Sequence, residues 1–501
     1  MAQGSKLRER TMELMTQGST RDRRPVGYGG PGGLAEVLRL GWPLILANSL
    51  WTAQVTIDRV LLGWYDERTV GAQMAAAWFF WVPFSLLYCT ANYISTFVAQ
   101  YRGAGRESRV WNAACQGVLF SLATGLGFLV WWPVAPAVFA LGGHTPTLMA
   151  AETLYFRCLC FAALPMLLSA SACAFFAGLG RTWVVLWIHL VGLASNALLD
   201  WLWIYGRWGF PAGGLAGAGW ATVAATWVSA LVGLAWMYAA GRAWGSVPKL
   251  PTWDWDLMRR LWRYGFPTGL QWALDTLAFT VFLFLLGRRG ELEMSAASIA
   301  FTLNMVVFMP PTGIGQAVSV LVGQYLGAER VPCARRATWN GFWVCWAYMS
   351  AVAAVLVLWP ERFTALFVNA ERADGAAVTL LTAHLLHYVA VYSLFDSANV
   401  VFAAALKGAG DTRFVALVQV LLAWALMVVP TWLVWSHADG MDWAWTFAAG
   451  YVIVLALVFW ARFQSGVWEK MRVIESVPTE DADRRSFHVH AAAGDAPRSE
   501  H

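Results

Sequence analysis

Long apolar runs alternate with short polar segments along most of the chain, and this pattern predicts membrane-spanning helices. A helix needs roughly 20 apolar residues to cross about 30 Å of hydrocarbon. Twelve runs reach that length, near residues 35–62, 72–100, 112–140, 147–177, 183–205, 214–240, 258–287, 296–325, 336–366, 375–406, 413–436 and 443–464. The flanking segments 1–33 and 465–501 are polar and lack periodicity, so we expect them to be disordered tails.

The composition excludes a soluble fold. Hydrophobic residues make up 58% of the 501 residues and charged residues only 13%, whereas soluble domains carry about 25% charged residues. The high apolar content also excludes an intrinsically disordered chain. Tryptophan, which collects where helices cross the membrane–water interface, occurs 32 times. These features predict an all-α polytopic membrane protein with twelve transmembrane helices.

The basic residues indicate how the helices are oriented. If both termini lie on one side, most of the 35 Lys and Arg residues fall in the tails and in the loops of that side. The loops of the other side hold Arg68, Arg207, Arg288, Arg289, Arg362 and Arg372. Loops rich in Lys and Arg remain in the cytoplasm, so we expect a multi-pass inner-membrane protein with two cytoplasmic termini. The net charge of +5 then reflects topology, and no nucleic-acid partner is expected.

Several short motifs recur at a constant spacing in the two halves of the chain. The most extended pair is VAQYRGAGR at 98–106 and VGQYLGAER at 322–330, and Gly41-Trp42-Pro43 is repeated as Gly265-Phe266-Pro267. Six predicted spans separate the copies, so both halves have the same orientation in the membrane. This predicts two six-helix lobes, 34–240 and 258–464, related by a pseudo-twofold axis along the membrane normal and joined by a loop at 241–257. Two lobes around a central cavity are typical of a transporter.

Four acidic residues lie deep within the apolar runs, namely Asp58, Asp200, Asp275 and Asp396. On insertion scales each costs about 2.5–3.5 kcal/mol at the middle of a membrane. Arg59 and Arg157 are the basic residues within the spans, and the four acids outnumber them. We therefore expect a function for these carboxyl groups. Hydrogen bonds between helices are the structural alternative.

The acids fall into two groups, one in each lobe. In the first lobe, Asp58, Asn196, Asp200 and Thr222 are predicted at one depth in the outer half of the membrane, with Asn196 one helical turn from Asp200. Such oxygen ligands suit a hard cation, with Na⁺ as the metal candidate, or a carboxylate pair that binds a proton. In the second lobe, Gln271 lies one turn before Asp275, and Tyr392 lies one turn before Asp396.

These motifs, in this order and at this spacing, resemble the multidrug and toxic compound extrusion (MATE) family of cation-coupled antiporters. The resemblance covers about residues 35–464. Its marks are Gly41-Trp42-Pro43 before Asp58, VAQYRGAG, NALLD at 196–200, GLAGAGWAT at 214–222, GFPTGLQWALD at 265–275, VGQYLGAE, YSLFD at 392–396 and KGAGDTR at 407–413. The resemblance implies a V-shaped pair of lobes that exports cationic or amphipathic compounds against an inward flow of H⁺ or Na⁺. It implies alternating access without covalent chemistry or a cofactor.

The resemblance also implies roles for individual residues. The Asp58, Asn196, Asp200 and Thr222 set matches the cation site of the DinF-like branch. The NorM-like branch binds cation in the second lobe with a Glu, a Tyr and an Asp, and this chain has Asp275 in place of the Glu, together with Tyr392 and Asp396. Because both sets of acids are present, the branch and the coupling ion stay open. Pro43 is implied as a hinge, and a plain packing kink is the alternative.

Other functions remain as alternatives. A lipid-linked oligosaccharide flippase would share the two-lobe fold, but it needs a cationic cavity for phosphate, and the deep charges here are acidic. A membrane-embedded transferase needs clustered catalytic residues, whereas the deep acids stand one per helix. A channel is disfavoured because channels mostly build their pores from identical subunits. No HExxH, P-loop or GxSxG motif occurs, so neither ATP-driven transport nor serine or zinc hydrolysis is supported, and we expect no enzymatic activity. We expect the transporter to be a monomer.

Overall fold

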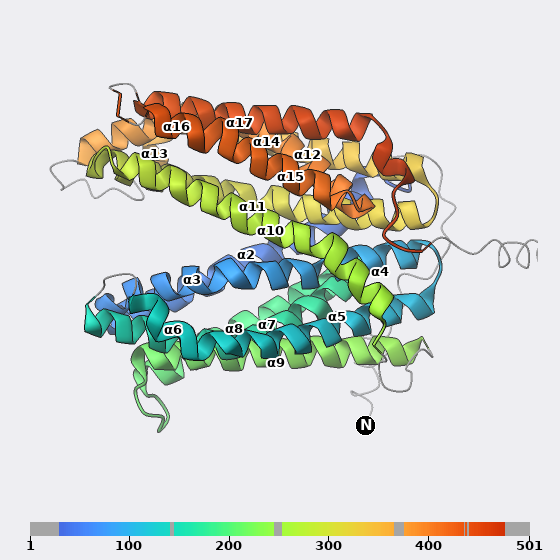
Figure 1. Ribbon diagram of the computed structural model, residues 1–501, viewed down its shortest axis with the longest axis horizontal. Coiled ribbons are helices and arrows are strands. Elements are labelled where there is room, and N and C mark those ends of the chain that lie inside the picture. Colours follow the sequence, from blue (N-terminus) through green and yellow to red (C-terminus); the bar gives the residue numbers. More distant parts are fainter. Residues whose placement is uncertain are drawn as a thin grey trace, which may run out of the picture.

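The computed structural model describes residues 30–140, 145–244, 253–364, 375–434, 436–437 and 440–475. Within these ranges the chain forms helices joined by short turns, and no strand occurs (Figure 1). Most helices run along the long axis of the molecule, as expected for a bundle that crosses a membrane. The predicted all-α fold is confirmed.

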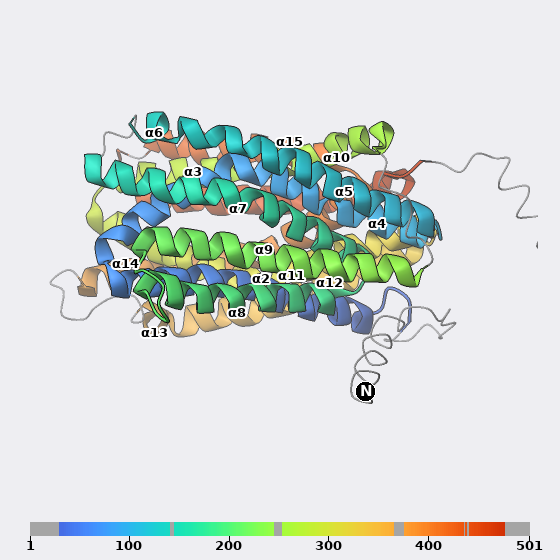
Figure 2. The same ribbon diagram turned by 90° about the horizontal axis from the view of Figure 1, so that it is seen from below.

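The first half of the chain forms one lobe, called the N-lobe. Its elements are α2 (Leu34–Tyr65), α3 (Glu67–Asn92), α4 (Ile94–Gly103), α5 (Glu107–Gly127), η1 (Phe128–Val130), α6 (Trp131–Ala140), α7 (Pro146–Gly178), α8 (Thr182–Tyr205) and α9 (Gly214–Ala243). The α3–α4 pair forms one span, and α5, η1 and α6 together form another. Pro133 has no amide hydrogen to donate to the carbonyl group of Leu129, and the chain narrows to a 3₁₀ turn at that point. Figure 2 shows α5, α7, α9 and α8 side by side in this lobe.

The second half forms the C-lobe. Its elements are α10 (Trp255–Gly287), α11 (Glu291–Gly327), α12 (Val331–Leu358), α13 (Pro360–Thr364), α14 (Gly375–Ala409), α15 (Thr412–Leu422), η2 (Ala423–Val428), α16 (Val429–Val434), α17 (Gly440–Gln464) and η3 (Val467–Lys470). The element η2 is a π-helical turn inside the span formed by α15 and α16. Pro430 explains this turn because it cannot donate a hydrogen bond to the carbonyl group of Leu426.

Eleven helical segments among the described residues are long and apolar enough to cross a membrane. The remaining long helix, α2, spans 32 residues, which corresponds to about 48 Å at 1.5 Å per residue. It is less apolar because Asn48, Gln54 and Asp58 interrupt its hydrophobic sequence. With α2 included, the twelve predicted spans are all present as helices.

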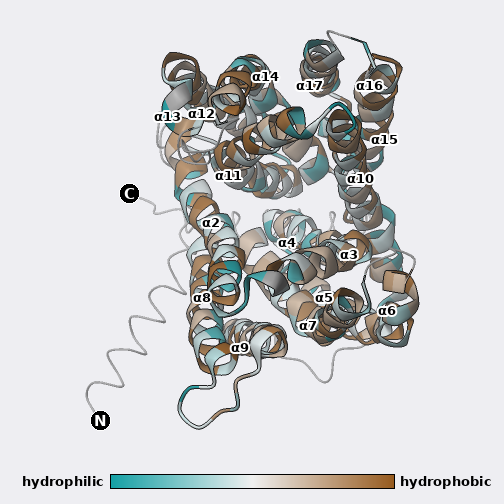
Figure 3. Ribbon diagram, turned by 90° about the vertical axis from the view of Figure 1, so that its left-hand side faces the viewer, coloured by the Kyte–Doolittle hydropathy of each residue, from teal (hydrophilic) through white to brown (hydrophobic). Residues whose placement is uncertain are grey.

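The two lobes lie side by side, as the end-on view in Figure 3 shows. They meet where α2 packs against α11, α3 against α10, and α4 against α11. The start of α2 and the segment that follows α17 lie at the same end of the bundle (Figure 1). We call it the termini end, and the other the opposite end.

A reciprocal pair of hydrogen bonds joins the lobes at the termini end. Gln100 on α4 donates its side-chain amide to the carbonyl oxygen of Gly408 on α14, over 3.0 Å. Gln324 on α11 donates in the same way to the carbonyl oxygen of Gly178 on α7, over 2.8 Å. The two glutamines are equivalent residues of the repeated motif. Their crossed contacts are those that a pseudo-twofold axis between the lobes would generate.

Two equivalent glycines allow this close crossing. A Cβ atom on Gly103 would lie 1.9 Å from the carbonyl oxygen of Gln324, and one on Gly327 would lie 2.0 Å from that of Gln100. Real Cβ atoms do not approach backbone atoms so closely, so only glycine fits at these two positions. The repeated glycine in VAQYRGAG and VGQYLGAE therefore serves the contact between the lobes.

Residues 465–475 differ from the expectation of a disordered tail beginning at 465. Trp468 is fully buried, its ring centroid lies 4.9 Å from that of Phe463, and its indole N–H donates to the carbonyl oxygen of Phe463 over 2.8 Å. In the sequence this single aromatic residue lies within a mostly polar segment, and so it did not indicate that the segment is packed. Burying a large ring stabilises the segment against the C-lobe.

The N-terminal boundary also differs slightly from the expectation of a tail at 1–33. The carbonyl oxygen of Gly32 accepts a hydrogen bond of 2.8 Å from the side-chain amide of Asn340, so the residues just before α2 are packed. Residues 1–29 and 476–501, the remainder of the two predicted tails, lie outside the described residues. Residues 245–252 of the predicted loop between the lobes lie outside them as well.

The close crossing predicts that alanine lowers stability at its two glycines but does not lower it at glycines that have open space around them. Gly103→Ala or Gly327→Ala should destabilise the protein, because overpacking costs about 1–3 kcal/mol. Gly127→Ala and Gly450→Ala should leave stability unchanged or raise it, since a Cβ there meets no atom within 4 Å and alanine favours a helix by about 1 kcal/mol. Thermal unfolding of the detergent-purified variants measures both effects. Equal melting temperatures for all four variants would refute the steric argument.

Candidate functional site

The four polar residues predicted to form a site in the N-lobe come together from three helices. Asp58 lies near one end of α2, Asn196 and Asp200 lie on α8, and Thr222 lies on α9. Helix α8 packs against both α2 and α9. The carboxyl groups of Asp58 and Asp200 are close enough to affect each other's charge, and Asn196 and Thr222 adjoin Asp58. We call this group the N-lobe cluster.

The N-lobe cluster is buried, and most of its polar side-chain atoms have no hydrogen-bond partner among the described residues. Asn196 and Asp200 are 0% exposed, Asp58 6% and Thr222 7%. Thr222 donates to Asp58 Oδ2 over 3.4 Å, and also to the carbonyl oxygen of Ala218. Within the described residues, Asp58 Oδ1, both polar atoms of the Asn196 side chain and both Asp200 oxygens have no hydrogen-bond partner. A buried polar atom without a partner costs about 1–3 kcal/mol, so the cluster favours a bound cation or proton.

Two further residues border the N-lobe cluster, and the sequence analysis did not single them out. Tyr155 on α7 is buried next to Thr222 and experiences the charges of Asp58 and Asp200. Its hydroxyl group accepts a hydrogen bond of 3.3 Å from the side-chain amide of Gln73 on α3. Both residues lie near the opposite end of their helices, as Asp58 does. A comparison of depths along the predicted spans would therefore have found them.

The predicted C-lobe residues also gather, around Asp275 on α10. The hydroxyl group of Tyr451 on α17 donates to Asp275 Oδ1 over 3.2 Å. Gln419 on α15 adjoins Asp275 and accepts a hydrogen bond from the side-chain amide of Gln271. The Lys407 ammonium group contributes a positive charge nearby. Sequence reasoning found Gln271 and Asp275 but missed Gln419 and Tyr451, which belong to helices far along the chain.

Asp396 and Tyr392 complete this group from α14. Asn399 donates its side-chain amide to Asp396 Oδ1 and to the carbonyl oxygen of Val452, both over 3.2 Å. Asp396 experiences the charge of Asp275, and Tyr392 experiences that of Asp396. The C-lobe cluster is therefore one neighbourhood of two carboxyl groups and several neutral polar groups. In contrast to the N-lobe cluster, several of its groups are hydrogen-bonded to one another.

The donor chemistry of the N-lobe cluster fits a small hard cation. Carboxylate, amide and hydroxyl oxygens are the ligands that such ions prefer. The described residues contain no group of three or more His, Cys, Asp and Glu side chains that could hold a metal ion, so a cation here would rely on two carboxylates and neutral oxygen groups. Two carboxyl groups with an amide and a hydroxyl group are also suited to exchange a proton.

Pro43 lies within α2, where the helix contacts the other lobe. It is buried, and α2 continues through it. The neighbouring Gly41 faces the side chain of Ile314 on α11, and the Asn48 side chain donates to Thr312 over 3.4 Å. Pro43 thus lies between the contact with α11 and the N-lobe cluster. Its role as a hinge stays a prediction.

Two packed lobes of membrane-spanning helices, each enclosing buried carboxyl groups, are the architecture of a membrane transporter. The MatE family model matches the chain twice, over residues 43–202 and 267–433. The chain therefore belongs to the MATE family of multidrug efflux transporters, and the resemblance found in its motifs is confirmed.

Named relatives and solved structures agree with this assignment. The chain is 30% identical to the multidrug resistance protein NorM of Burkholderia vietnamiensis, over 85% of this chain and 92% of that protein. It is 26% identical to the multidrug resistance protein MdtK of Cronobacter sakazakii, over 89% of this chain and 96% of that protein. The fold matches the outward-facing conformation of a multidrug resistance MATE family transporter with a TM-score of 0.79, covering 90% of this chain and 100% of that chain at 18% identity. That likeness concerns the fold alone.

The unpaired state of Asp200 predicts an unusual effect on stability. Asp200→Asn should raise the melting temperature, because it removes a buried carboxyl group whose oxygens lack partners. Asp411→Asn is the matched control, since Asp411 is also buried but pairs with Arg462 over 2.8 Å. It should lower the melting temperature because the arginine loses its partner. Thermal unfolding at constant pH compares the two, and a lower melting temperature for Asp200→Asn would support a structural role instead.

Proposed function

We propose that this transporter is an antiporter that exports cationic or amphipathic organic compounds in exchange for inward-moving H⁺ or Na⁺. The two lobes would alternate between openings on either side of the membrane. The N-lobe cluster would bind the coupling ion, and the C-lobe cluster would attract the cargo and contribute to coupling. The transporter would act as a monomer in the inner membrane.

One observation carries this proposal, namely the buried pair Asp58 and Asp200, in which three of the four carboxyl oxygens have no hydrogen-bond partner among the described residues. Such a pair is unfavourable in hydrocarbon unless it binds a cation or a proton. The ion that relieves this cost on one side of the membrane is released on the other when the lobes rearrange. Binding then changes the relative free energies of the two conformations, which is the requirement for coupling.

The orientation of the chain supports inward movement of the ion. Most of the Lys and Arg residues that the structure describes lie at the termini end, so this end is proposed as cytoplasmic. The N-lobe cluster lies toward the opposite end and would face the periplasm. One charge that moves inward through 100 mV releases about 2.3 kcal/mol, which supports a cargo gradient of roughly fiftyfold.

The C-lobe cluster supports cationic cargo. Asp275 and Asp396 lie in the interior of α10 and α14, where a cargo would have lost its water shell. A carboxylate attracts a cation much more strongly in such surroundings than in water. Mid-membrane acids would repel the phosphate groups of a lipid-linked oligosaccharide, so a flippase function is less well supported.

The proposal is tested by measuring drug efflux in everted membrane vesicles. A pH gradient and a Na⁺ gradient are applied separately, each with a dye that is cationic and one that is neutral. Uptake of dye driven by either gradient supports antiport and identifies the ion. Absence of uptake with both gradients, for a range of dyes, would refute it.

The N-lobe carboxyl groups should be essential for coupling. Asp58→Asn and Asp200→Asn keep the shape of the side chain but remove the group that binds a proton or chelates a cation. We expect correctly inserted protein that does not pump. Glu67→Gln, an exposed acid at the start of α3, serves as the control and should pump normally. Normal efflux by both aspartate variants would move the coupling site to the C-lobe.

The C-lobe carboxyl groups should discriminate between cargoes. Asp275→Asn and Asp396→Asn should reduce transport of cationic dyes more than transport of neutral dyes, because the direct attraction is lost. The comparison is made at matched expression in the vesicle assay. An equal proportional loss for both classes of dye would contradict cargo attraction and leave packing or ion coupling as the role of these acids.

A further inference from the structure

The C-terminal segment 465–475 crosses from the C-lobe to the N-lobe at the termini end. Its first residues pack on the C-lobe through Trp468. Further along, the backbone N–H of Val473 donates to the side-chain oxygen of Gln100 in the N-lobe over 2.9 Å. The carbonyl oxygen of Val473 accepts from Arg260 in the C-lobe over 3.3 Å. The segment thus contacts Gln100, one of the two glutamines that join the lobes.

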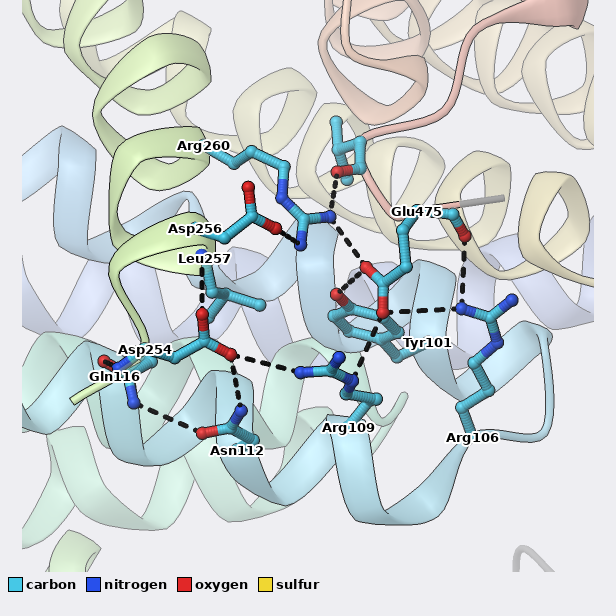
Figure 4. Close-up of polar contacts among 11 residues, drawn as sticks. Tyr101, Arg106, Arg109, Asn112, Gln116, Asp254, Asp256, Leu257, Arg260 and Glu475 are labelled. Atoms are coloured by element: carbon cyan, nitrogen blue, oxygen red, sulfur yellow. Dashed lines mark hydrogen bonds and ion pairs between the residues drawn. The ribbon is translucent and has the colours of Figure 1, made fainter. Parts of the chain in front are cut away.

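Glu475 continues this bridge with its carboxylate (Figure 4). On the N-lobe side it accepts a hydrogen bond of 2.6 Å from the Tyr101 hydroxyl group and pairs with Arg109 over 3.2 Å and Arg106 over 3.5 Å. On the C-lobe side it pairs with Arg260 over 2.7 Å. Arg106 also donates to the backbone carbonyl oxygen of Glu475 over 3.1 Å. One carboxylate therefore connects side chains from both lobes.

The internal repeat shows why this carboxylate comes from the segment after the last transmembrane helix. Tyr325 in the C-lobe is the repeat equivalent of Tyr101, and its hydroxyl group donates to Glu36 on α2 over 2.5 Å. The repeat equivalent of Glu36 is Arg260, which has no acceptor for a tyrosine hydroxyl group. Glu475 supplies the acceptor that Tyr101 would otherwise lack, and it binds Arg260 as well. The segment completes an interlobe contact that the second repeat leaves incomplete.

At neutral pH the negative charge of Glu475 offsets the positive charges of the arginines around it. Burial acts to raise the pKa of its carboxyl group, but hydrogen bonds from Tyr101 and Arg260 outweigh burial and lower the pKa to about 2. The group therefore stays ionised near neutrality. Without it, the guanidinium groups of Arg106, Arg109 and Arg260 would face one another across the lobe boundary with less compensation. Their repulsion would favour separation of the lobes at this end.

We propose that residues 465–475 form a latch that holds the two lobes together at the termini end. Release of Glu475 from Tyr101 and the N-lobe arginines is a required step before the lobes separate there. The latch acts on the conformational step of the proposed transport cycle, but its effect on lobe separation is measurable without transport.

The test measures the distance between the lobes in the full-length protein. Spin labels are attached at Ser108 in the N-lobe and Arg413 in the C-lobe, both exposed at the termini end, after replacement of the seven native cysteines. Double electron–electron resonance then gives the populations of joined and separated lobes. For Glu475→Gln we expect the ratio of separated to joined lobes to rise about tenfold, which corresponds to about 1.4 kcal/mol.

A matched control comes from the same segment. Glu469→Gln also removes one negative charge, but Glu469 pairs with Arg335 within the C-lobe, so its distance distribution should equal that of the parent protein.

Tyr101→Phe removes one donor to Glu475 without changing charge and should shift the populations in the same direction by a smaller amount. If Glu475→Gln is poorly folded, the distances measured for Tyr101→Phe decide whether the latch exists. Unchanged distances in the Glu475 and Tyr101 variants, or an equal shift in the Glu469 variant, would overturn the latch. If Glu475→Gln shows the expected shift in the interlobe distances but the parent protein does not export dye, only the proposed antiport is refuted.

Discussion

The crossing of α4 and α11 determines how the two lobes are held together. Gly103 and Gly327 bring the backbones into contact, and Gln100 and Gln324 each donate to a carbonyl group of the other lobe. A hydrogen bond of this kind contributes only about 0.5–1.5 kcal/mol net. We call this contact between α4 and α11 the joint. It combines a close steric fit of the two backbones with hydrogen bonds that are individually weak. Such a joint specifies one arrangement of the lobes, and the proposed transport cycle would require its weak bonds to break.

The polar sites depend on this joint through α2. The first turn of this helix holds Glu36, which contacts Tyr325 of the other lobe, and the helix then passes α11 at Gly41 and ends two turns after Asp58. One continuous element thus links the termini end, the interlobe contact and the N-lobe cluster. A change of charge at Asp58 acts on a helix that also contributes to the joint. Pro43 removes one backbone hydrogen bond along this route, which lowers the cost of bending it there.

Much of the fold followed from the sequence because hydrocarbon imposes a strict length and polarity on each span. The twelve helices, the two lobes and the gathering of Asp58, Asn196, Asp200 and Thr222 could be predicted from apolar runs and depth. Partners contributed by distant helices could not, as Tyr451 beside Asp275 illustrates, because a helix's rotation about its axis is set by packing. The order of residues 465–475 was missed for a related reason. One tryptophan anchors a polar segment, and periodicity does not reveal a single anchor.

The segment containing Glu475 introduces an asymmetry into a duplicated fold. If both halves were alike, each interlobe tyrosine would bind a carboxylate fixed on a transmembrane helix, as Tyr325 binds Glu36. Here the carboxylate bound to Tyr101 belongs to a short segment after the last helix. Detaching it breaks a few polar contacts that water can replace and unwinds no transmembrane helix. One side of the joint is therefore easier to open than the other. Under the proposed latch, release would therefore occur on the Tyr101 side, and the Tyr325 contact would keep the lobes aligned.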